Sequence, residues 1–129
     1  LRQLCWREAG VDRSKKGMSA ALAKVKRDYE ILLKEPLLDL VFSQSKEEIN
    51  EFDEIARRDL NLLLDLSNRQ MSSSLMLEAC LFREESRGGH FRDDFPTSVP
   101  FWKCHTRQLK GEQIHTRPVK DISSDSKNL

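Results

Sequence analysis

The feature that most constrains the fold is the stretch of residues 45–86, because it contains neither proline nor glycine. Apolar residues recur along it at helical spacing. They form two stripes, the first made of Ile49, Phe52, Ala56, Leu60, Leu63 and Leu66, and the second of Met71, Leu75, Ala79 and Phe82. The segment SNRQMSSS between them is polar and a weak helix former. The sequence therefore predicts helix here, and it leaves open whether residues 47–86 form one long helix or two joined by a kink.

Two shorter helices are expected before this stretch. Residues 1–9 place their apolar side chains on one face, and Gly10 stands where a helix commonly ends. Ser14 is a candidate N-cap for a second helix that ends before Pro36. Its apolar stripe consists of Met18, Leu22, Val25, Tyr29 and Leu32.

The connection to the long stretch is less defined. The segment PLLDLVFSQ fits either a helical turn or an apolar connection. Ser45 and Glu48 then have the spacing of a capping box, which marks the start of the next helix. Three helices that each bury one stripe predict an all-α, spectrin-repeat-like three-helix bundle over residues 1–89.

The chain changes character after the pair Gly88 and Gly89. Prolines become frequent, and the segments FWKCHTRQL and QIHTRPV have strand-like composition. Gly111 lies in the short connection between them, which indicates a β-hairpin. We expect residues 90–121 to form an extended tail that carries this hairpin, and residues 122–129 to be a frayed terminus.

Composition excludes several classes of function. The net charge is +1, and acidic residues are interleaved with the basic ones, so a nucleic-acid-binding face is not predicted. No apolar run approaches the length of a membrane span. Three widely separated cysteines indicate reduced thiols in a cytosolic-type compartment. The chain opens without an initiator methionine or a signal-like segment, and we expect it to be a piece of a longer protein.

The segment EESRGGHFRDDFP, residues 84–96, is the strongest candidate for a functional site. Its acids, bases and histidine around two glycines have the composition of a catalytic site. Helix termination accounts for part of the pattern, since Arg87 could complement the helix dipole and Gly88 or Gly89 could adopt the left-handed conformation. Opposite charges can also satisfy one another when buried. A structural or docking role is therefore favoured, and direct chemistry is the alternative.

Other reactive groups are poorly spaced. Cys80, His90, Cys104, His105 and His115 do not have zinc-ligand spacing, and no thiol-activating context surrounds Cys104. No glycine-rich loop suited to a dinucleotide is present. The spacing of these groups therefore predicts no metal-binding or cofactor-binding residue in this chain, and direct chemistry by residues 84–96 stays the alternative.

Four segments, taken in order, resemble a known family. They are LRQLCWREAGVDRSKKGM, FREESRGGHFRDDFP, FWKCHT and RPVKD. Together they resemble the C-terminal helical domain of the succinate dehydrogenase/fumarate reductase flavoprotein family. Within the family they look most similar to L-aspartate oxidases of the cyanobacterial type. The flavoprotein of a succinate dehydrogenase or fumarate reductase is the alternative, as is a stand-alone helical interaction module.

The resemblance implies a supporting role in a larger flavoenzyme. In the family, FAD is bound by a separate flavin domain, and substrate is held between that domain and a capping domain of the same polypeptide. The family's catalytic residues do not map onto this chain, so the chain alone is expected to bind no FAD and to be inactive. The candidate residues for docking onto the flavin domain are Glu85, Arg87, His90, Arg92, Asp94, His105, Thr106 and Arg117.

Overall fold

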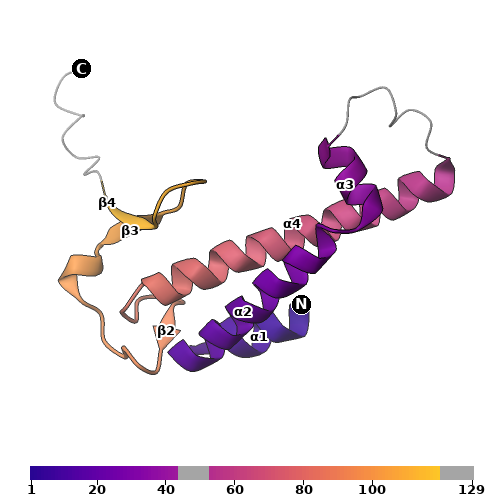
Figure 1. The fold of residues 1–129 in the computed structure, drawn as a ribbon. Helices are drawn as coiled ribbons and strands as arrows, with labels where there is room; N and C mark the ends of the chain where they lie inside the picture. The colour runs from indigo at the N-terminus through magenta and orange to yellow at the C-terminus, as the bar shows by residue number, and fades with distance from the viewer. Residues whose placement is uncertain (44–52, 120–129) are drawn as a thin grey trace, which may run out of the picture.

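The computed structural model of the chain describes residues 1–43 and 53–119. Its helices are α1 (Arg2–Ala9), α2 (Lys15–Leu32), α3 (Pro36–Ser43) and α4 (Glu54–Phe82). Its strands are β1 (Asp12–Arg13), β2 (Phe91–Arg92), β3 (Cys104–Arg107) and β4 (His115–Pro118), and η2 (Pro100–Trp102) is a short 3₁₀ helix. The predicted helical fold with an irregular tail and a small hairpin is confirmed (Figure 1).

Helices α2 and α4 lie side by side and antiparallel, and they form the body of the molecule (Figure 1). Near the start of α2, buried Met18, Ala21 and Val25 pack with Leu77 of α4, and Ala9 of α1 joins this cluster. A second cluster lies toward the other end of α4 and consists of Leu32, Leu38 and Leu60. The two short helices therefore close opposite ends of the long pair, with α1 at one end and α3 at the other.

The boundaries of the first two helices follow the predicted signals. Gly10 is the C-cap of α1, and a Cβ atom there would lie 2.2 Å from the carbonyl oxygen of Trp6, so only glycine fits without a backbone shift. Ser14 is the N-cap of α2, and its side-chain oxygen accepts a hydrogen bond of 3.1 Å from the amide of Gly17. Both predictions are confirmed.

The segment PLLDLVFSQ resolves in favour of a helix. Pro36 is the first residue of α3, a position where the missing amide hydrogen costs nothing. Leu38 of this helix is fully buried. The described residues thus contain four helices where the sequence predicted three.

Helix α4 runs without interruption over 29 residues, so the alternative of two separate helices is wrong for the described residues. At 1.5 Å per residue it is ~44 Å long. It begins after Asp53, whose side chain accepts a hydrogen bond of 2.7 Å from the amide of Ala56. The capping box of Ser45 and Glu48 lies outside the described residues, as do Ile49 and Phe52.

The second predicted stripe of α4 is not the core face. Leu77 is fully buried, whereas Leu75 is 44% exposed and Met71 is also exposed. The core face passes through Leu60 and Leu77, with Ser67 and Gln70 buried between them. Two polar residues on the buried face therefore shifted the apparent stripe to the wrong side of the helix, and Leu66 of the first stripe is 40% exposed.

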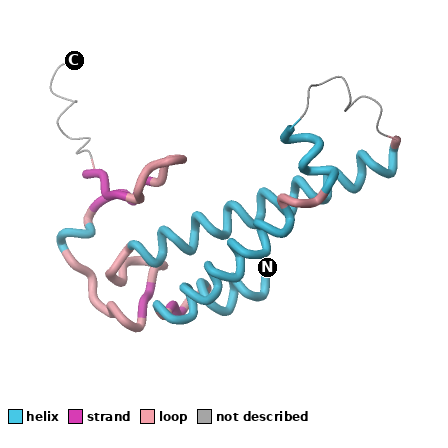
Figure 2. The backbone as a smooth tube through the Cα atoms, in the orientation of Figure 1, coloured by secondary structure: helices cyan, strands magenta, loops and turns pink. Residues whose placement is uncertain are grey.

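The tail contains the predicted hairpin. Strands β3 and β4 are antiparallel, with Cys104 opposite Pro118 and Arg107 opposite His115. Gly111 lies in the connection and has a φ of 82°, which L-residues with side chains rarely adopt. Figure 2 shows the hairpin beyond the C-terminal end of α4. The expected frayed terminus, residues 122–129, lies outside the described part.

Candidate functional site

The chain folds back immediately after α4. Ser86 holds this reversal: its hydroxyl accepts a hydrogen bond of 2.9 Å from the amide of Arg92 and donates one of 2.8 Å to the carbonyl of Phe95. The backbones of Arg87 and His90 exchange two hydrogen bonds of 2.8 and 3.0 Å. This is a two-residue turn, and Gly88 has a φ of 56° within it.

Gly88 and Gly89 do not end α4, contrary to the sequence interpretation. Helix α4 stops at Phe82, and Arg83 is extended. The positive φ at Gly88 belongs to the turn that follows, five residues after the C-cap position, so only the conformation of Gly88 was predicted correctly.

Glu85 is the acidic centre of the reversal, and it is fully buried. Its carboxylate accepts hydrogen bonds of 2.9 Å from Nε of Arg83, 2.9 Å from Nε of Arg87 and 2.9 Å from the amide of Val99. These donors, with that of Arg87 first, lower the pKa of Glu85 to about 2, against the opposing effect of burial. Glu85 is therefore ionised at neutral pH and committed to bonds within the chain.

Arg83 connects this centre to the tail. Its Nη1 donates a hydrogen bond of 3.1 Å to the carbonyl of Cys104, and its Nη2 donates to the carbonyl of Trp102. The indole of Trp102 packs edge-on against Phe82 at 5.4 Å between ring centroids. One guanidinium thus fixes the start of the hairpin to the end of α4.

Arg92 is the basic centre, and it too is fully buried. Its Nη1 donates to the carbonyls of Cys80, Leu81 and Arg83 at 3.2, 2.8 and 3.0 Å. These are carbonyls at the end of α4, which lack partners inside the helix and lie at the negative end of its dipole. Arg92, and not Arg87 as the sequence suggested, therefore caps the helix.

The other edge of the Arg92 guanidinium pairs with Asp94. Nε lies 3.0 Å from Oδ1, and Nη2 lies 2.5 Å from Oδ2, so the pair is bidentate. The bond to Arg92 lowers the pKa of the Asp94 carboxyl. The arginine charge is thus balanced by one carboxylate and by the helix end.

His90 is half-buried, and its Nε2 lies 3.2 Å from the carbonyl oxygen of Arg83. Because that partner only accepts, Nε2 carries the proton. Burial lowers the pKa of His90, and the nearby guanidinium of Arg13 acts in the same direction. His90 is therefore neutral at pH 7 and serves as a further donor to the end of α4.

Arg13 is a residue of the site that sequence reasoning missed. Its Nη1 donates 2.8 Å to the carbonyl of Gly89, and its own carbonyl accepts 2.9 Å from the amide of Asp93. Strands β1 and β2 pair in parallel here, with Arg13 opposite Arg92. No local pattern around Arg13 announces this contact, because the partners are about eighty residues away.

The residues described so far form a charged cluster, made of Arg13, Arg83, Glu85, Arg87, His90, Arg92 and Asp94. The remaining docking candidates are not part of this charged cluster. His105 and Arg117 lie opposite one another in the hairpin and are exposed, whereas Thr106 is half-buried. Cys104 and His105 are adjacent in β3, so their side chains point to opposite faces of the strand. This geometry argues against a cysteine–histidine catalytic pair.

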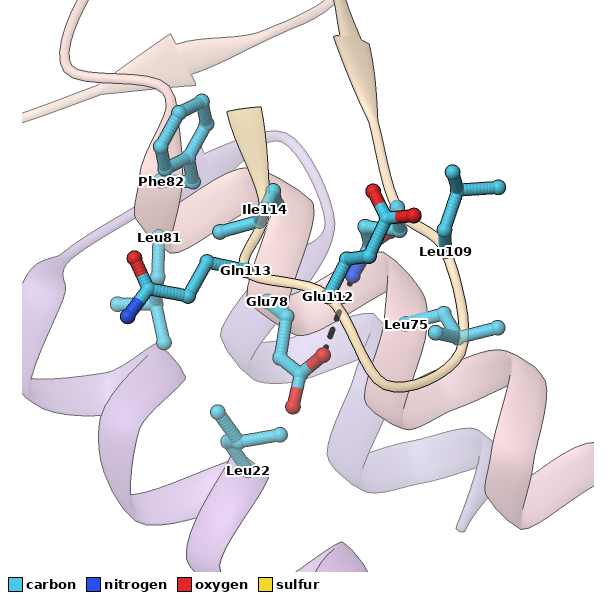
Figure 3. Close-up of a pocket in the computed structure, with 10 residues that line it drawn as sticks. Leu22, Leu75, Glu78, Leu81, Phe82, Leu109, Glu112, Gln113 and Ile114 are labelled. Carbon is cyan, nitrogen blue, oxygen red and sulfur yellow. Dashed lines mark hydrogen bonds between the residues drawn. The ribbon is translucent and has the colours of Figure 1, made fainter. Parts of the chain in front are cut away.

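A concave surface lies between the hairpin connection and the helices (Figure 3). Leu75 and Phe82 of α4 line it together with Leu109 and Ile114 of the connection. Glu78 accepts a hydrogen bond of 3.1 Å from Gln108 and forms an ion pair of 2.6 Å with Lys26. Leu75 and Phe82 of α4 thus line one surface with the tail, and Glu78 is bound by both Gln108 of the tail and Lys26 of α2.

The hydrogen bonds of the charged cluster hold its ionisable groups to partners within the chain. Proton transfer is most effective when the pKa of the group lies near the working pH. Glu85 has a pKa of about 2 and no exposed surface, and Nε2 of His90 is bonded to a carbonyl. Across residues 1–43 and 53–119, no group of three histidine, cysteine or acidic side chains could hold a metal ion.

Among the described residues, the glycines with positive φ do not form the turn that normally holds a flavin pyrophosphate. Flavin pyrophosphate is normally held where a strand of a parallel sheet leads through a glycine-rich turn into a helix. In the described part of the chain the positive-φ glycines, Gly88 and Gly111, lie in a tight turn and a hairpin connection instead. Within the same residues, no helix is both long and apolar enough to span a bilayer.

Comparison with known proteins gives a consistent set of relatives. The family described as fumarate reductase flavoprotein C-term matches residues 1–125. The L-aspartate oxidase of Nostoc sp. is 35% identical over 82% of this chain and 18% of its own length. The L-aspartate oxidase of Synechocystis sp. is 33% identical over 92% of this chain and 21% of its own.

A third relative comes from the archaeon Methanothermobacter marburgensis. It is a component of the fumarate reductase (CoM/CoB), and it is 30% identical over 80% of this chain and 16% of its own length. The chain therefore spans about a fifth of the length of the curated relatives it matches.

Proposed function

Because the chain belongs to the family of the C-terminal region of fumarate reductase flavoproteins, we propose that it is the C-terminal helical domain of an L-aspartate oxidase. The whole enzyme uses FAD to oxidise L-aspartate to iminosuccinate, the first step of NAD biosynthesis in the cytoplasm. The observation that carries this proposal is the match to two cyanobacterial L-aspartate oxidases over most of the chain. FAD and substrate are bound by the rest of the polypeptide, in its flavin-binding and capping domains.

In this proposal the chain supports the enzyme and does not take part in the chemistry. Residues 1–89 are the helical bundle, and residues 90–121 are a tail that packs on the bundle and on the flavin domain. The engagement of Glu85 and Arg92 within the chain supports a structural role, since neither has exposed surface for a substrate. They hold the shape of the docking surface, and the more exposed Arg87, His105 and Arg117 make contacts across it.

The flavoprotein of a fumarate reductase or succinate dehydrogenase is the second candidate. It is favoured by the 30% identity to the archaeal fumarate reductase component. Both candidates place the same helical domain beside a flavin domain, so they differ in substrate and not in the role of this chain.

The test uses the whole polypeptide and the 129-residue chain in parallel. With FAD bound, the whole protein should oxidise L-aspartate, and succinate should be a poor electron donor. Rapid turnover of succinate without turnover of aspartate contradicts the proposal and supports the second candidate. The 129-residue chain, titrated with FAD, should leave flavin fluorescence unchanged; micromolar binding would contradict the assignment of the flavin site to other domains.

A further inference from the structure

An apolar groove runs between α1 and α4, on a part of the molecule that the charged cluster does not fill. Leu1 and Trp6 of the N-terminal segment line one side, together with Val11 in the following loop, and Leu66 and Met76 of α4 line the other. Trp6 is 75% exposed and Val11 is 73% exposed. Large apolar side chains gathered in this way are characteristic of an interaction surface.

The local backbone is arranged so that these side chains stand together. At Gly10 the chain passes so close to the Trp6 carbonyl that a Cβ atom would be 2.2 Å away. This close turn brings Val11 to the same groove as Trp6. The next residues are then fixed in β1, whose Arg13 bonds to Gly89. Trp6 and Val11 are thus held in place by the close turn at Gly10 and by the pairing of β1 that follows.

The groove is continuous with the turn of the charged cluster, because Gly89 also lines it. The turn runs from Arg87 to His90, so the apolar surface around Trp6 adjoins the charged cluster at Gly89. An apolar centre beside polar groups is the usual composition of a specific interface.

The occupant follows from the length of the relatives. This chain covers about a fifth of their length, and the family corresponds to the C-terminal part of a flavoprotein. On the proposed function, the rest of the polypeptide precedes Leu1, which itself lines the groove. A covalently linked domain that emerges at the edge of an apolar groove has a high effective concentration there.

We propose that the groove between α1 and α4 is the principal seat of the preceding domain of the same polypeptide, with Trp6 and Val11 as its anchoring side chains. This inference rests on the proposed function, since it requires that the preceding domain exists. In this proposal, apolar contacts at the groove supply most of the docking affinity. The charged cluster fixes the orientation of the preceding domain. Exposed aromatic side chains commonly dominate the affinity of such surfaces.

The experiment is made on the whole polypeptide, with a specific protease site inserted in the residues before Leu1. After cleavage, the affinity between the two pieces is measured by titration, and size-exclusion chromatography with mass detection gives their stoichiometry. The variants are Trp6→Glu and Val11→Glu. Ile55→Glu is the matched control, because Ile55 is 72% exposed and apolar but lies in the first turn of α4, outside the groove.

The expected result is that the cleaved parent and Ile55→Glu stay associated, whereas each groove variant binds about 100-fold more weakly. Circular dichroism of the released piece checks that it remains helical, and Val11→Glu lies outside any helix. Equal affinity of the groove variants and the parent overturns the proposal. The proposal is also overturned if the C-terminal piece of the cleaved parent elutes alone or as a pair of identical pieces.

The two proposals fail separately in this design. Aspartate and succinate turnover are measured on the uncleaved polypeptide. Aspartate turnover in the parent, combined with unchanged docking of both groove variants, rejects the groove alone. Succinate turnover combined with loss of docking in both variants rejects the proposed substrate alone.

Discussion

Replacing Arg92 with methionine should destabilise the chain more than any comparable change on the surface of α4. Methionine has a length similar to that of the aliphatic part of the arginine side chain. It removes every donor of the fully buried guanidinium. Three carbonyls at the end of α4 then lose their Nη1 partner, and Asp94 loses its bidentate partner. Because Asp94 is partly exposed, water can solvate it, and most of the cost comes from the carbonyls at the end of the helix.

The magnitude follows from the burial of the group. A buried carbonyl left without its hydrogen-bond partner costs about 1–3 kcal/mol, so the loss of Arg92 from the three carbonyls is expected to cost about 3–5 kcal/mol in total, out of a total stability of about 5–15 kcal/mol for a domain. With about 4 °C of melting temperature per kcal/mol for a chain of this size, the expected loss is about 12–20 °C. Arg92→Lys should lie between, because it keeps the charge but cannot reproduce the planar fork.

Thermal unfolding followed by circular dichroism provides the measurement. The control is Arg69→Met in α4, where the arginine is exposed and forms an ion pair of 2.7 Å with Asp65. Such a surface pair contributes less than about 1 kcal/mol. If Arg92→Met and Arg69→Met melt within a few degrees of one another, Arg92 does not cap α4 in the way described.

Three further predictions test the fold and the cluster. Leu77→Ala should cost about 2–5 kcal/mol of unfolding free energy and the exposed Leu75→Ala much less; equal losses in urea unfolding would show that the core face of α4 is misassigned. The folded-state pKa of Glu85 is lowered to about 2 from 4.5, so its stabilising contribution is complete above pH 4.5 and lost as the pH falls toward 2. Glu85→Gln should therefore be less stable than the parent at pH 7, and the difference should shrink between pH 4.5 and 2; a pH-independent difference would rule out this ionisation as its source. Gly88→Ala should cost about 1–2 kcal/mol because of its φ of 56°, while Gly89→Ala, also in open space and without a positive φ, should melt close to the parent.

Local signals in the sequence were sufficient for most helix and strand assignments. Gly10 and Ser14 act through neighbours within four residues, and both were predicted correctly. The hairpin followed in the same way from strand-like segments on either side of Gly111. These features depend on short-range geometry, which a single sequence records directly.

The errors arose where distant contacts decide the outcome. The polar Ser67 and Gln70 occupy the core face of α4, so periodicity pointed to Leu75 and Phe82 instead. Those two side chains line a concave surface together with the hairpin connection, which lies about thirty residues further along the chain (Figure 3). Apolar periodicity marks a face that carries apolar side chains, but it does not show which element lies against that face or whether the face is buried.

The same distinction applies to the charged cluster. The segment of residues 84–96 was recognised as the candidate site, and the structure brings Glu85, Arg87, His90, Arg92 and Asp94 together there. The division of roles was not predictable, because Glu85 depends on the amide of Val99 and Arg92 on carbonyls of α4. Arg13 reaches the site because β1 pairs with β2, and the residues next to it in the sequence did not predict this contact.

The central claim is that this chain supports a flavoenzyme and supplies no catalytic residue. The most direct test is turnover per bound FAD in the whole polypeptide carrying Arg87→Ala or His90→Ala, measured together with FAD occupancy and melting temperature. We predict that occupancy or melting temperature falls while turnover per bound FAD stays close to that of the parent. A fall of several orders of magnitude in turnover per bound FAD, with occupancy and melting temperature unchanged, would contradict the claim and place the cluster at the substrate.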